Sequence, residues 1–450
     1  MGRAMGRRPT APTARSVAAR VLERVLRDQA FASAALDAEL ERAAQLAMRD
    51  RRLATELVYG TLRVRRMLEQ RLAQFAPRGL DGLDAATKSH LLMAAYQLMV
   101  LEKIPVFAAV SEAVNGVRAA RGEALARFTN ALLRKLGAEV QAQGRPTLVD
   151  AVVASMDPWL LDRIAAALGS VEQARDYVAA GPFPPPVCLR LRLGEQREPW
   201  LQRLQQACVD ARIEAGHASP LCITLQAAGA VQRLPGYRDH WIVQEEGSQL
   251  VGIALGTRST DRVLDACAGR GNKTTLLAEL AREGSVDAAD LYASKLDTLR
   301  EQVQAMGGAL AAVHAVDWSA GSGDVPDGFD RVLVDAPCSG TGTIRRRPDL
   351  LGRELRAALP QLQRLQASIL TRAASRCRPG GRVIYSVCSV LREEAEHVIE
   401  QVTAAEPWLR PAPFEAPELR ALAAEATSVR LLPHVHGTDG YFIASLRREA

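Results

Sequence analysis

The chain lacks the features that mark a membrane protein or a secreted one. Its longest apolar run, Leu91–Leu101, is about half of a bilayer span and is interrupted by Gln97. The basic N-terminal segment, Met1–Arg15, has no apolar stretch of the kind that a secretory signal requires. We also find no internal repeat and no low-complexity tract. We therefore expect a cytoplasmic protein that has no membrane helix.

Cysteine is scarce and shows no paired spacing. The seven cysteines among 450 residues include no Cys-x-x-Cys pair, which argues against a disulfide framework and against a zinc site. His434 and His436 lie near the C-terminus without a set of further ligands, so we assign no metal. Cysteines that stay reduced are free to act as nucleophiles.

The charge balance is slightly basic. Lys and Arg number 57 against 51 Asp and Glu, a formal net charge of +6, and most of the basic residues are arginine. Guanidinium groups pair with phosphates in bidentate fashion, so the balance favours a polyanionic partner. A soluble, arginine-rich surface would give the same numbers.

The chain is too long for one hydrophobic core, and we expect two to four domains. From about Ala14 to Leu136, apolar residues recur at a spacing of three or four, as in Val17, Val21 and Val25. This pattern predicts an all-helical domain over residues 10–140. A polar stretch, Gly137–Thr147, separates it from the next region.

Residues 150–243 predict linker helices followed by a small α+β module. The segment Gly181–Pro186, "GPFPPP", breaks any helix and is typical of a stiff connector. The elements predicted after it are a strand at Val187–Leu193, a helix at Trp200–Ala211 and a strand at Leu221–Leu225.

Residues 244–450 predict a doubly wound parallel sheet, because strand-like runs alternate with helical stretches such as Lys273–Arg282. The predicted strands are Arg262–Ala266, Ser285–Leu291, Ala311–Val316, Asp330–Asp335 and Arg382–Val387. Ligands of such sheets bind at the carboxyl ends of the strands. The candidate binding and catalytic residues of this sequence fall at these strand ends.

The first of these strand ends has a cofactor-type turn. In "VLDACAGRGNKT", Val263–Thr274, Gly269 and Gly271 allow a ligand to approach the backbone, and Lys273 opens the next helix. A tight turn that binds nothing would look the same.

Two acids on the next strand ends favour a cofactor of the adenosine type. Asp290, nineteen positions after Gly271, can accept both hydroxyls of a ribose, and Asp317 is placed to accept an adenine amino group. Acids at strand ends can also cap the following helices. The turn lacks a full Gly-x-Gly-x-x-Gly signature, so methyl transfer is favoured over hydride transfer.

Several motifs carry a resemblance to a known family. They are "VQEEGSQLV" (Val243–Val251), "VLDACAGRGNKT", "DAPCSGTG" (Asp335–Gly342), "YSVCS" (Tyr385–Ser389) and "LLPHVHGTDGYFIASL" (Leu431–Leu446). Together they resemble the S-adenosylmethionine-dependent RNA cytosine-5 methyltransferases of the Sun family. The helical N-terminal part is similar to the antitermination factor NusB, as in the bacterial 16S ribosomal RNA branch of that family. The resemblance covers nearly the whole chain.

The resemblance implies a fold, a cofactor and a substrate. The fold would be an all-α NusB-like N-terminal domain, a small RRM-like α+β module and a C-terminal Rossmann-like class I methyltransferase domain. The cofactor would be S-adenosylmethionine, and the substrate 16S ribosomal RNA, free or in an early assembly intermediate. We expect a monomer without an obligatory protein partner.

Two cysteines, fifty positions apart, fit the chemistry of this family. Carbon 5 of cytosine is too electron-poor to attack a methyl sulfonium until a thiolate has added to carbon 6. The resemblance implies that Cys388 is the nucleophile, that Cys338 assists product release, and that Asp335 binds the cytosine edge near the methionine part of the cofactor. A lone cysteine is usually a small buried hydrophobe, and that role is assigned to Cys188, Cys208, Cys222 and Cys377.

The expected cofactor-binding residues are Cys267, Ala268, Gly269, Arg270, Gly271, Asn272, Lys273, Asp290, Asp317 and Asp335. The turn departs from the family's usual Ala-Pro-Gly-Gly-Lys, because Arg270 replaces the proline and Asn272 replaces the second glycine. Asn tolerates left-handed backbone geometry, so we expect the turn to persist.

RNA contacts are expected at Arg345, Arg346 and Arg347, which follow Cys338 closely, although a solvated charge run is the alternative. Further affinity is expected from arginines of the helical domain, namely Arg49, Arg51, Arg52, Arg63, Arg65 and Arg66. A base attacked at carbon 6 must be unstacked, so the target is single-stranded or flipped.

A second hypothesis is a non-catalytic RNA-binding or antitermination-type factor that retains a methyltransferase fold. The NusB-like region and the altered turn motivate it. The presence of Cys338, Cys388 and Asp335 argues for the enzyme, since a binding factor has no need of them.

Overall fold

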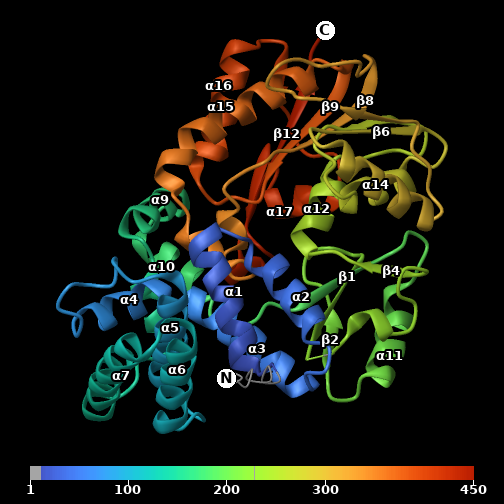
Figure 1. Ribbon diagram of the computed structural model, residues 1–450. Coiled ribbons are helices and arrows are strands. Elements are labelled where there is room, and N and C mark those ends of the chain that lie inside the picture. Colours follow the sequence, from blue (N-terminus) through green and yellow to red (C-terminus); the bar gives the residue numbers. More distant parts are fainter. Residues whose placement is uncertain (1–11, 228) are drawn as a thin grey trace, which may run out of the picture. The chain divides into compact units, whose positions relative to one another are not determined.

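The computed structural model describes residues 12–227 and 229–450 (Figure 1). Residues 1–11, which hold most of the basic N-terminal segment, lie outside the described residues. The chain forms two compact units. A helical unit extends to Leu161 and includes Ile344–Arg353. The second unit, Asp162–Thr343 and Glu354–Ala450, contains the residues predicted to be catalytic and is therefore called the catalytic unit below. Among the described residues, every helix is too short or too polar to span a bilayer.

The helical unit contains the helices predicted from the apolar spacing. Its helices are α1 (Ala14–Asp28), α2 (Ala32–Arg42), α3 (Met48–Arg63), α4 (Arg65–Ala73), α5 (Ala85–Met99), α6 (Val106–Arg121), α7 (Glu123–Gln143) and α8 (Leu148–Ser155). Val17, Val21 and Val25 are buried on one face of α1, as the spacing predicts. α1 begins at a capping box in which Thr13 accepts from the backbone N–H of Ser16.

The longest apolar run of the sequence is a core helix. α5 is buried around almost its whole circumference and packs against α1, α3, α6 and α7. A helix surrounded by other helices has no polar face to offer to water. The polar stretch Gly137–Thr147 is helical in its first seven residues, because Gly137–Gln143 extends α7 by two turns.

The catalytic unit begins with a small α+β module. After α9 (Pro158–Leu168) and α10 (Val171–Ala179), an antiparallel sheet of order β2-β3-β1-β4 packs against α11 (Arg197–Ala207). Its strands are β1 (Val187–Leu191), β2 (Arg212–Ala215), β3 (Cys222–Gln226) and β4 (Trp241–Val243). β2 and β4 were not predicted, because β2 is only "RIEA" and β4 has three residues.

The large sheet has the order β10-β12-β9-β8-β5-β6-β7, and β11 pairs with β12. Its strands are β5 (Arg262–Asp265), β6 (Ser285–Asp290), β7 (Ala312–Ala315), β8 (Phe329–Asp335), β9 (Cys377–Val387), β10 (Leu409–Pro411), β11 (Ser428–Leu431) and β12 (Tyr441–Arg448). The predicted parallel pairing is confirmed for β5 to β9, whereas β10, β11 and β12 pair antiparallel.

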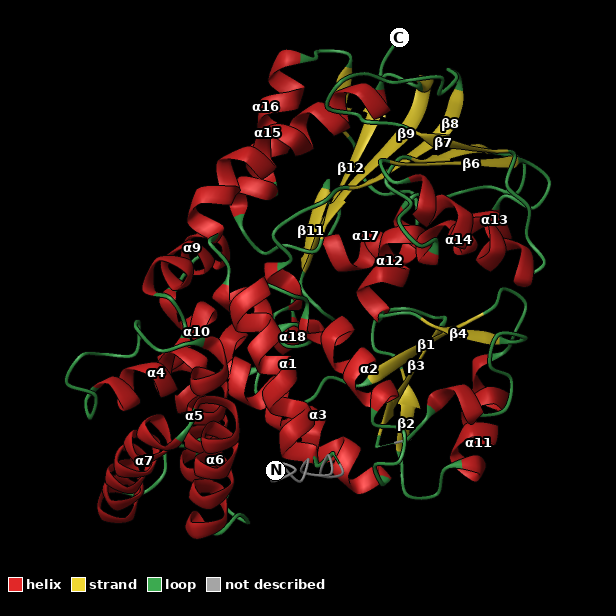
Figure 2. Cartoon of the chain, in the orientation of Figure 1, coloured by secondary structure: helices red, strands yellow, loops and turns green. Residues whose placement is uncertain are grey.

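Helices cover this sheet, as in other doubly wound folds (Figure 2). They are α12 (Glu246–Ala254), α13 (Asn272–Leu280), α14 (Ala293–Ala305), α15 (Leu355–Ala374), α16 (Glu396–Ala405), α17 (Pro417–Ala423) and the short α18 (Pro433–His436). The middle of β8, Val332–Val334, is fully buried. Since β5, β6, β8 and β9 run parallel, their carboxyl ends meet at one edge, which therefore gathers the predicted site residues.

Candidate active site

The two predicted cysteines lie against each other. Cys338 follows β8, Cys388 follows β9, and their sulfur atoms are 3.3 Å apart. The two loops are also joined by the Gly342 N–H, which donates to the Cys388 carbonyl. The hydrogen bond with Cys388, and burial, raise the pKa of Cys338 well above that of a free thiol. While both cysteines are free thiols, this contact and burial favour the protonated form of Cys338.

A partly buried ion pair lies beside the cysteines. Lys273 Nζ in the first turn of α13 is 2.6 Å from Asp335 Oδ2 at the end of β8. Burial lowers the pKa of Lys273, but the Asp335 carboxylate outweighs burial and the pKa is raised on balance. The charge of Cys388 also favours the protonated amine. The sequence analysis assigned Lys273 to the cofactor turn alone, but the structure connects it to Asp335.

A residue that the sequence analysis missed holds the two cysteine loops. Glu394, in the short 3₁₀ turn Arg392–Glu394, is fully buried. Its carboxylate accepts from the Ser339 N–H (2.7 Å), the Ser339 hydroxyl (2.5 Å) and the Gln366 side-chain amide (3.0 Å). Gln366 also donates to the carbonyl of Pro337. Both neighbours of Cys338 are thereby fixed.

Hydroxyl groups extend this network to the second cysteine. The Thr341 and Ser389 hydroxyls are 2.9 Å apart, and the Val390 N–H donates to Thr341 Oγ1. The Tyr177 hydroxyl donates to the Thr341 carbonyl over 2.6 Å. A connected polar network of this kind favours one arrangement of its loops. The sulfur contact is therefore built into the fold rather than made by mobile side chains.

The cofactor-type turn persists, but not for the predicted reason. The left-handed positions are Gly269 (φ +57°) and Gly271 (φ +92°), while Asn272 is the first helical residue. Asn272 therefore needs no left-handed tolerance, and its side-chain oxygen accepts from Gln302. A side chain built on Gly269 would meet nothing within 4 Å, so open space lies beside the turn.

A carboxylate oxygen without a hydrogen-bond partner in the described chain lies at this turn. Asp265 ends β5 and is buried; Oδ2 accepts from the Thr274 hydroxyl, while Oδ1 has no partner among the described residues. Burial raises the pKa of Asp265 to about 6, and the Thr274 hydrogen bond only partly offsets this. A buried acceptor without a donor is costly, so a polar ligand group fits here.

The two acids predicted to bind the adenosine lie on the neighbouring strand ends. Asp290 ends β6, and its carboxylate accepts from the Gly269 N–H (3.0 Å) and the Tyr292 N–H (3.0 Å). Asp317 follows β7 and is exposed. Hydrogen bonds from the Ser319 hydroxyl and N–H lower the pKa of Asp317. Both acids stand at the same sheet edge as the turn.

Two family models match the chain. The 16S rRNA methyltransferase RsmB/F model matches residues 252–447, and the NusB family model matches residues 12–138. A putative methyltransferase of Mycobacterium tuberculosis is 34% identical, with 98% of each chain covered. The probable ribosomal RNA small subunit methyltransferase B of Bacillus subtilis is 31% identical, with 97% of this chain and 98% of that protein covered. The chain belongs to the RsmB/F family.

Solved structures share the fold of this family member. PH0851 superposes with a TM-score of 0.79 at 21% identity, over 98% of this chain and all of that chain. NSun6 from Pyrococcus horikoshii, solved with SFG, gives a TM-score of 0.55 at 18% identity over 65% of this chain and 98% of that one. The NusB-like helical region and the methyltransferase fold expected from the sequence are thus confirmed, and the protein is a methyltransferase.

The arginines predicted to contact RNA group with the helical unit of this RsmB/F protein. Segment Ile344–Arg353 belongs to that unit, and its 3₁₀ turn Pro348–Gly352 packs against α3. Arg345 is buried, and its carbonyl accepts from Arg63. The Arg347 guanidinium lies over the Phe31 ring, 5.0 Å from its centroid. Their contact with RNA stays a prediction.

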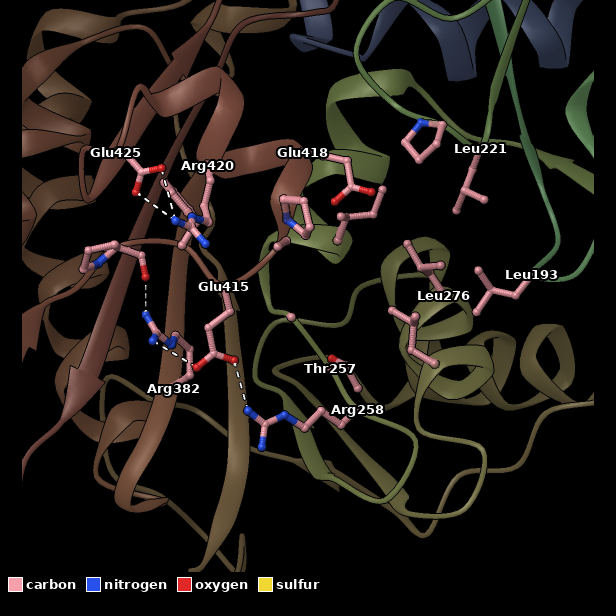
Figure 3. Close-up of a pocket in the computed structure, with 18 residues that line it drawn as sticks. Leu193, Leu221, Thr257, Arg258, Leu276, Arg382, Glu415, Glu418, Arg420 and Glu425 are labelled. Carbon is pink, nitrogen blue, oxygen red and sulfur yellow. Dashed lines mark hydrogen bonds and ion pairs between the residues drawn. The ribbon is translucent and has the colours of Figure 1, made fainter.

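Another cavity, of about 830 Å³, lies near the amino ends of the parallel strands, away from the cysteines (Figure 3). Arg258, Arg382 and Arg420 line it, but the first two face Glu415 and the third faces Glu425. Its guanidinium groups are thus compensated, which leaves no excess charge for a phosphate. The described residues contain no cluster of three or more His, Cys, Asp or Glu side chains that could hold a metal.

Proposed function

We propose that this RsmB/F family protein transfers a methyl group from S-adenosylmethionine to carbon 5 of a cytosine in 16S ribosomal RNA, through a covalent bond between Cys388 and the base. The observation that carries the proposal is the 3.3 Å contact of the two cysteine sulfurs beside the Lys273–Asp335 pair. A purely structural pair of cysteines needs no ion pair next to it.

The residues around the turn fit an S-adenosylmethionine molecule. The open space beside Gly269 and the unpartnered Asp265 Oδ1 provide room and a free acceptor. Residues 267–273 would hold the amino-acid part together with Asp335, Asp290 the ribose, and Asp317 the adenine. When bound, the cofactor supplies an electrophilic methyl group. The NSun6 structure, solved with the S-adenosylmethionine analogue SFG, supports this assignment.

Cys388 is the nucleophile in this proposal. Its thiolate adds to carbon 6 of the cytosine, the electron pair of the ring double bond moves toward N3, and carbon 5 becomes nucleophilic. The Lys273 ammonium interacts electrostatically with Cys388, and the Cys338 sulfur is in contact with it. The attacking role is assigned to Cys388 by the resemblance of its motif, "YSVCS", to that of the family.

Asp335 recognises the cytosine base through hydrogen bonds. Its carboxylate accepts from the cytosine N4 amino group and from N3 once that nitrogen is protonated, and Lys273 holds the carboxylate in place. Uracil presents an oxygen where cytosine has the amino group, so it would place two acceptors against each other. The pair therefore supports cytosine over uracil.

Cys338 acts at the end of the reaction. After methyl transfer, the proton on carbon 5 must leave so that the ring double bond can form again and expel Cys388. Once Cys388 is bonded to carbon 6, the sulfur contact that raises the pKa of Cys338 is lost, and Cys338 then assists the removal of this proton as, or through, a general base. The buried Glu394 keeps Cys338 in place.

Ribosomal RNA is the proposed substrate because relatives with similar full-length chains, such as those from Bacillus subtilis and Yersinia pseudotuberculosis, are named small-subunit ribosomal RNA methyltransferases. A cytoplasmic location fits a substrate made there and a reaction that needs reduced thiols.

The test is methyl transfer to protein-free 16S RNA, followed by sequencing for 5-methylcytosine. Wild-type protein should modify a defined cytosine, and Cys388→Ala should not. The control is Cys208→Ala, which replaces a partly exposed cysteine outside the site and should behave as wild type. Methylation that survives Cys388→Ala, or at another atom of the base, would overturn the proposal. Cofactor at a hundredfold excess over its dissociation constant should stabilise the enzyme by about 2.7 kcal/mol, and no stabilisation would favour a binding factor.

A further inference from the structure

The helical unit carries a groove between α6 and α7 with an unusual lining. The two helices are neighbours joined at Gly122 and run in opposite directions (Figure 2). Their side chains line a cavity of about 640 Å³. Gly137 of α7 faces Val106 of α6, so the start of α6 lies beside the end of α7. Valines of α6 form an apolar floor, and polar side chains form the rims.

An aromatic ring stands exposed at one end of this groove. Phe107 is 81% exposed, the highest value among the exposed aromatic side chains of the described chain. The other exposed phenylalanine of the helical unit, Phe31, lies beneath the guanidinium groups of Arg347 and Arg353. Phe107 has no such ring contact in the described residues. An exposed flat ring of this kind offers a stacking surface for a base.

Two arginines on the rim lack a hydrogen-bonded partner in the described chain, although Arg127 interacts electrostatically with Glu123. Arg127 and Arg134 are exposed, seven residues apart on one side of α7, which separates them by about 10 Å along the helix axis. Neither makes a hydrogen bond or an ion pair with a described residue. Glu123, the one acid among the lining residues, is instead bound by Arg118 over 2.7 Å.

The segment that forms the groove is positively charged, like the two arginines on its rim. Residues 103–135 contain six basic side chains and two acidic ones. This differs from the cavity of the catalytic unit, whose arginines face carboxylates (Figure 3). The lining residues include three arginines and one glutamate, so the groove keeps an excess of positive charge above an apolar floor. A protein surface gains little from such a groove, whereas a nucleic-acid strand brings both phosphates and ring faces.

We propose that the α6–α7 groove binds a single-stranded segment of RNA, with a base stacked on Phe107 and backbone phosphates paired with Arg127 and Arg134. The Asn115 and Asn130 amides on the rims provide donors and acceptors for base edges. The inference rests on the proposed function for the identity of the RNA, and it adds a second contact surface, outside the catalytic unit.

The test uses the full-length protein and a short, fluorescein-labelled single-stranded RNA of mixed sequence. Anisotropy titrations over a series of salt concentrations compare wild type, Arg127→Gln/Arg134→Gln and Phe107→Ala. The control, Arg78→Gln/Lys135→Gln, removes the same charge from exposed positions of the same unit outside the groove. Matching thermal unfolding of all variants establishes that each one is folded.

The two groove variants should differ in how their RNA affinity depends on salt. Loss of two phosphate contacts reduces the slope of log affinity against log salt by about 1.4, since each contributes about 0.7 on a single strand. Phe107→Ala should weaken binding about 10-fold with an unchanged slope, because stacking does not release counterions. The control should retain wild-type affinity.

Affinity and slope that stay at wild-type values in both groove variants would overturn the inference. The inference would also be overturned if the groove variants, without RNA, sedimented differently from wild type while their RNA binding stayed intact. The groove would then be an interface between two copies of the protein. Methyl transfer is measured in parallel. If the groove variants bind RNA and methylate it normally, only the groove inference is refuted. If the groove variants bind RNA more weakly but the wild type does not methylate it, the proposed function is refuted and the groove inference is retained.

Discussion

Replacement of Glu394 tests whether one buried carboxylate holds the two cysteine loops together. In Glu394→Ala, the Ser339 N–H, the Ser339 hydroxyl and the Gln366 amide lose their shared acceptor. A hydrogen bond to a charged group contributes about 1.5–3 kcal/mol, and orphaned buried donors add to the cost. Because such contributions are not additive, we expect the free energy of unfolding to fall by about 3–5 kcal/mol.

Glu394→Gln should cost less, about 1–2 kcal/mol, because the amide keeps one acceptor. The control is Glu393→Gln, which loses only an ion pair with Arg163 and should change stability by less than about 1 kcal/mol. Urea unfolding measures all three. Displacement of the reacting groups by about 1 Å costs on the order of 100-fold in rate, so methyl transfer by Glu394→Ala should fall that far. A stability within 1 kcal/mol of wild type would refute the reasoning.

Two more predictions concern groups at the same sheet edge. Asp265 has a folded pKa of about 6, above the ordinary value of 3.8, so its contribution to stability is lost as the pH rises through this window. Urea unfolding of wild type and Asp265→Asn measures this loss. Between pH 5 and pH 8, the difference in the free energy of unfolding should shift by about 1–2 kcal/mol in favour of the variant. A difference that does not depend on pH would contradict the burial argument. Cys338 and Cys388 should form a disulfide with diamide, which takes up the two thiol hydrogens; methyl transfer should stop and return with dithiothreitol. Oxidised protein that keeps full activity, or a bond that uses Cys208, would contradict the sulfur contact.

The parallel core of the fold was predictable because its strands are short apolar runs with clear ends. β5, β6, β7 and β8 lie within one or two residues of the prediction. β9 begins at Cys377 rather than Arg382, because the segment "RPGG" has turn-type residues but continues the strand. The prediction gave no antiparallel strand order for β10–β12, since no local pattern indicates the direction of a neighbouring strand.

The site was predictable where its residues stand in motifs, and not where only tertiary packing defines them. Both cysteines and Asp335 come from such motifs, and the structure brings them together. Glu394 lies in "REEAE", which has the composition of a solvated helix face, and only the fold shows that it is buried. Residues 344–353 interrupt the catalytic unit to join the helical one, which no linear reading of domain boundaries can show.

The central claim is that Cys388 attacks the base and Cys338 releases it. The most direct measurement is incubation of the Cys338→Ala variant with 16S RNA and S-adenosylmethionine, followed by a denaturing gel. The account predicts a protein–RNA band that survives denaturation and disappears when Cys388 is also replaced. If Cys338→Ala releases methylated RNA at the wild-type rate with no such band, or if the band persists without Cys388, the assigned roles are wrong.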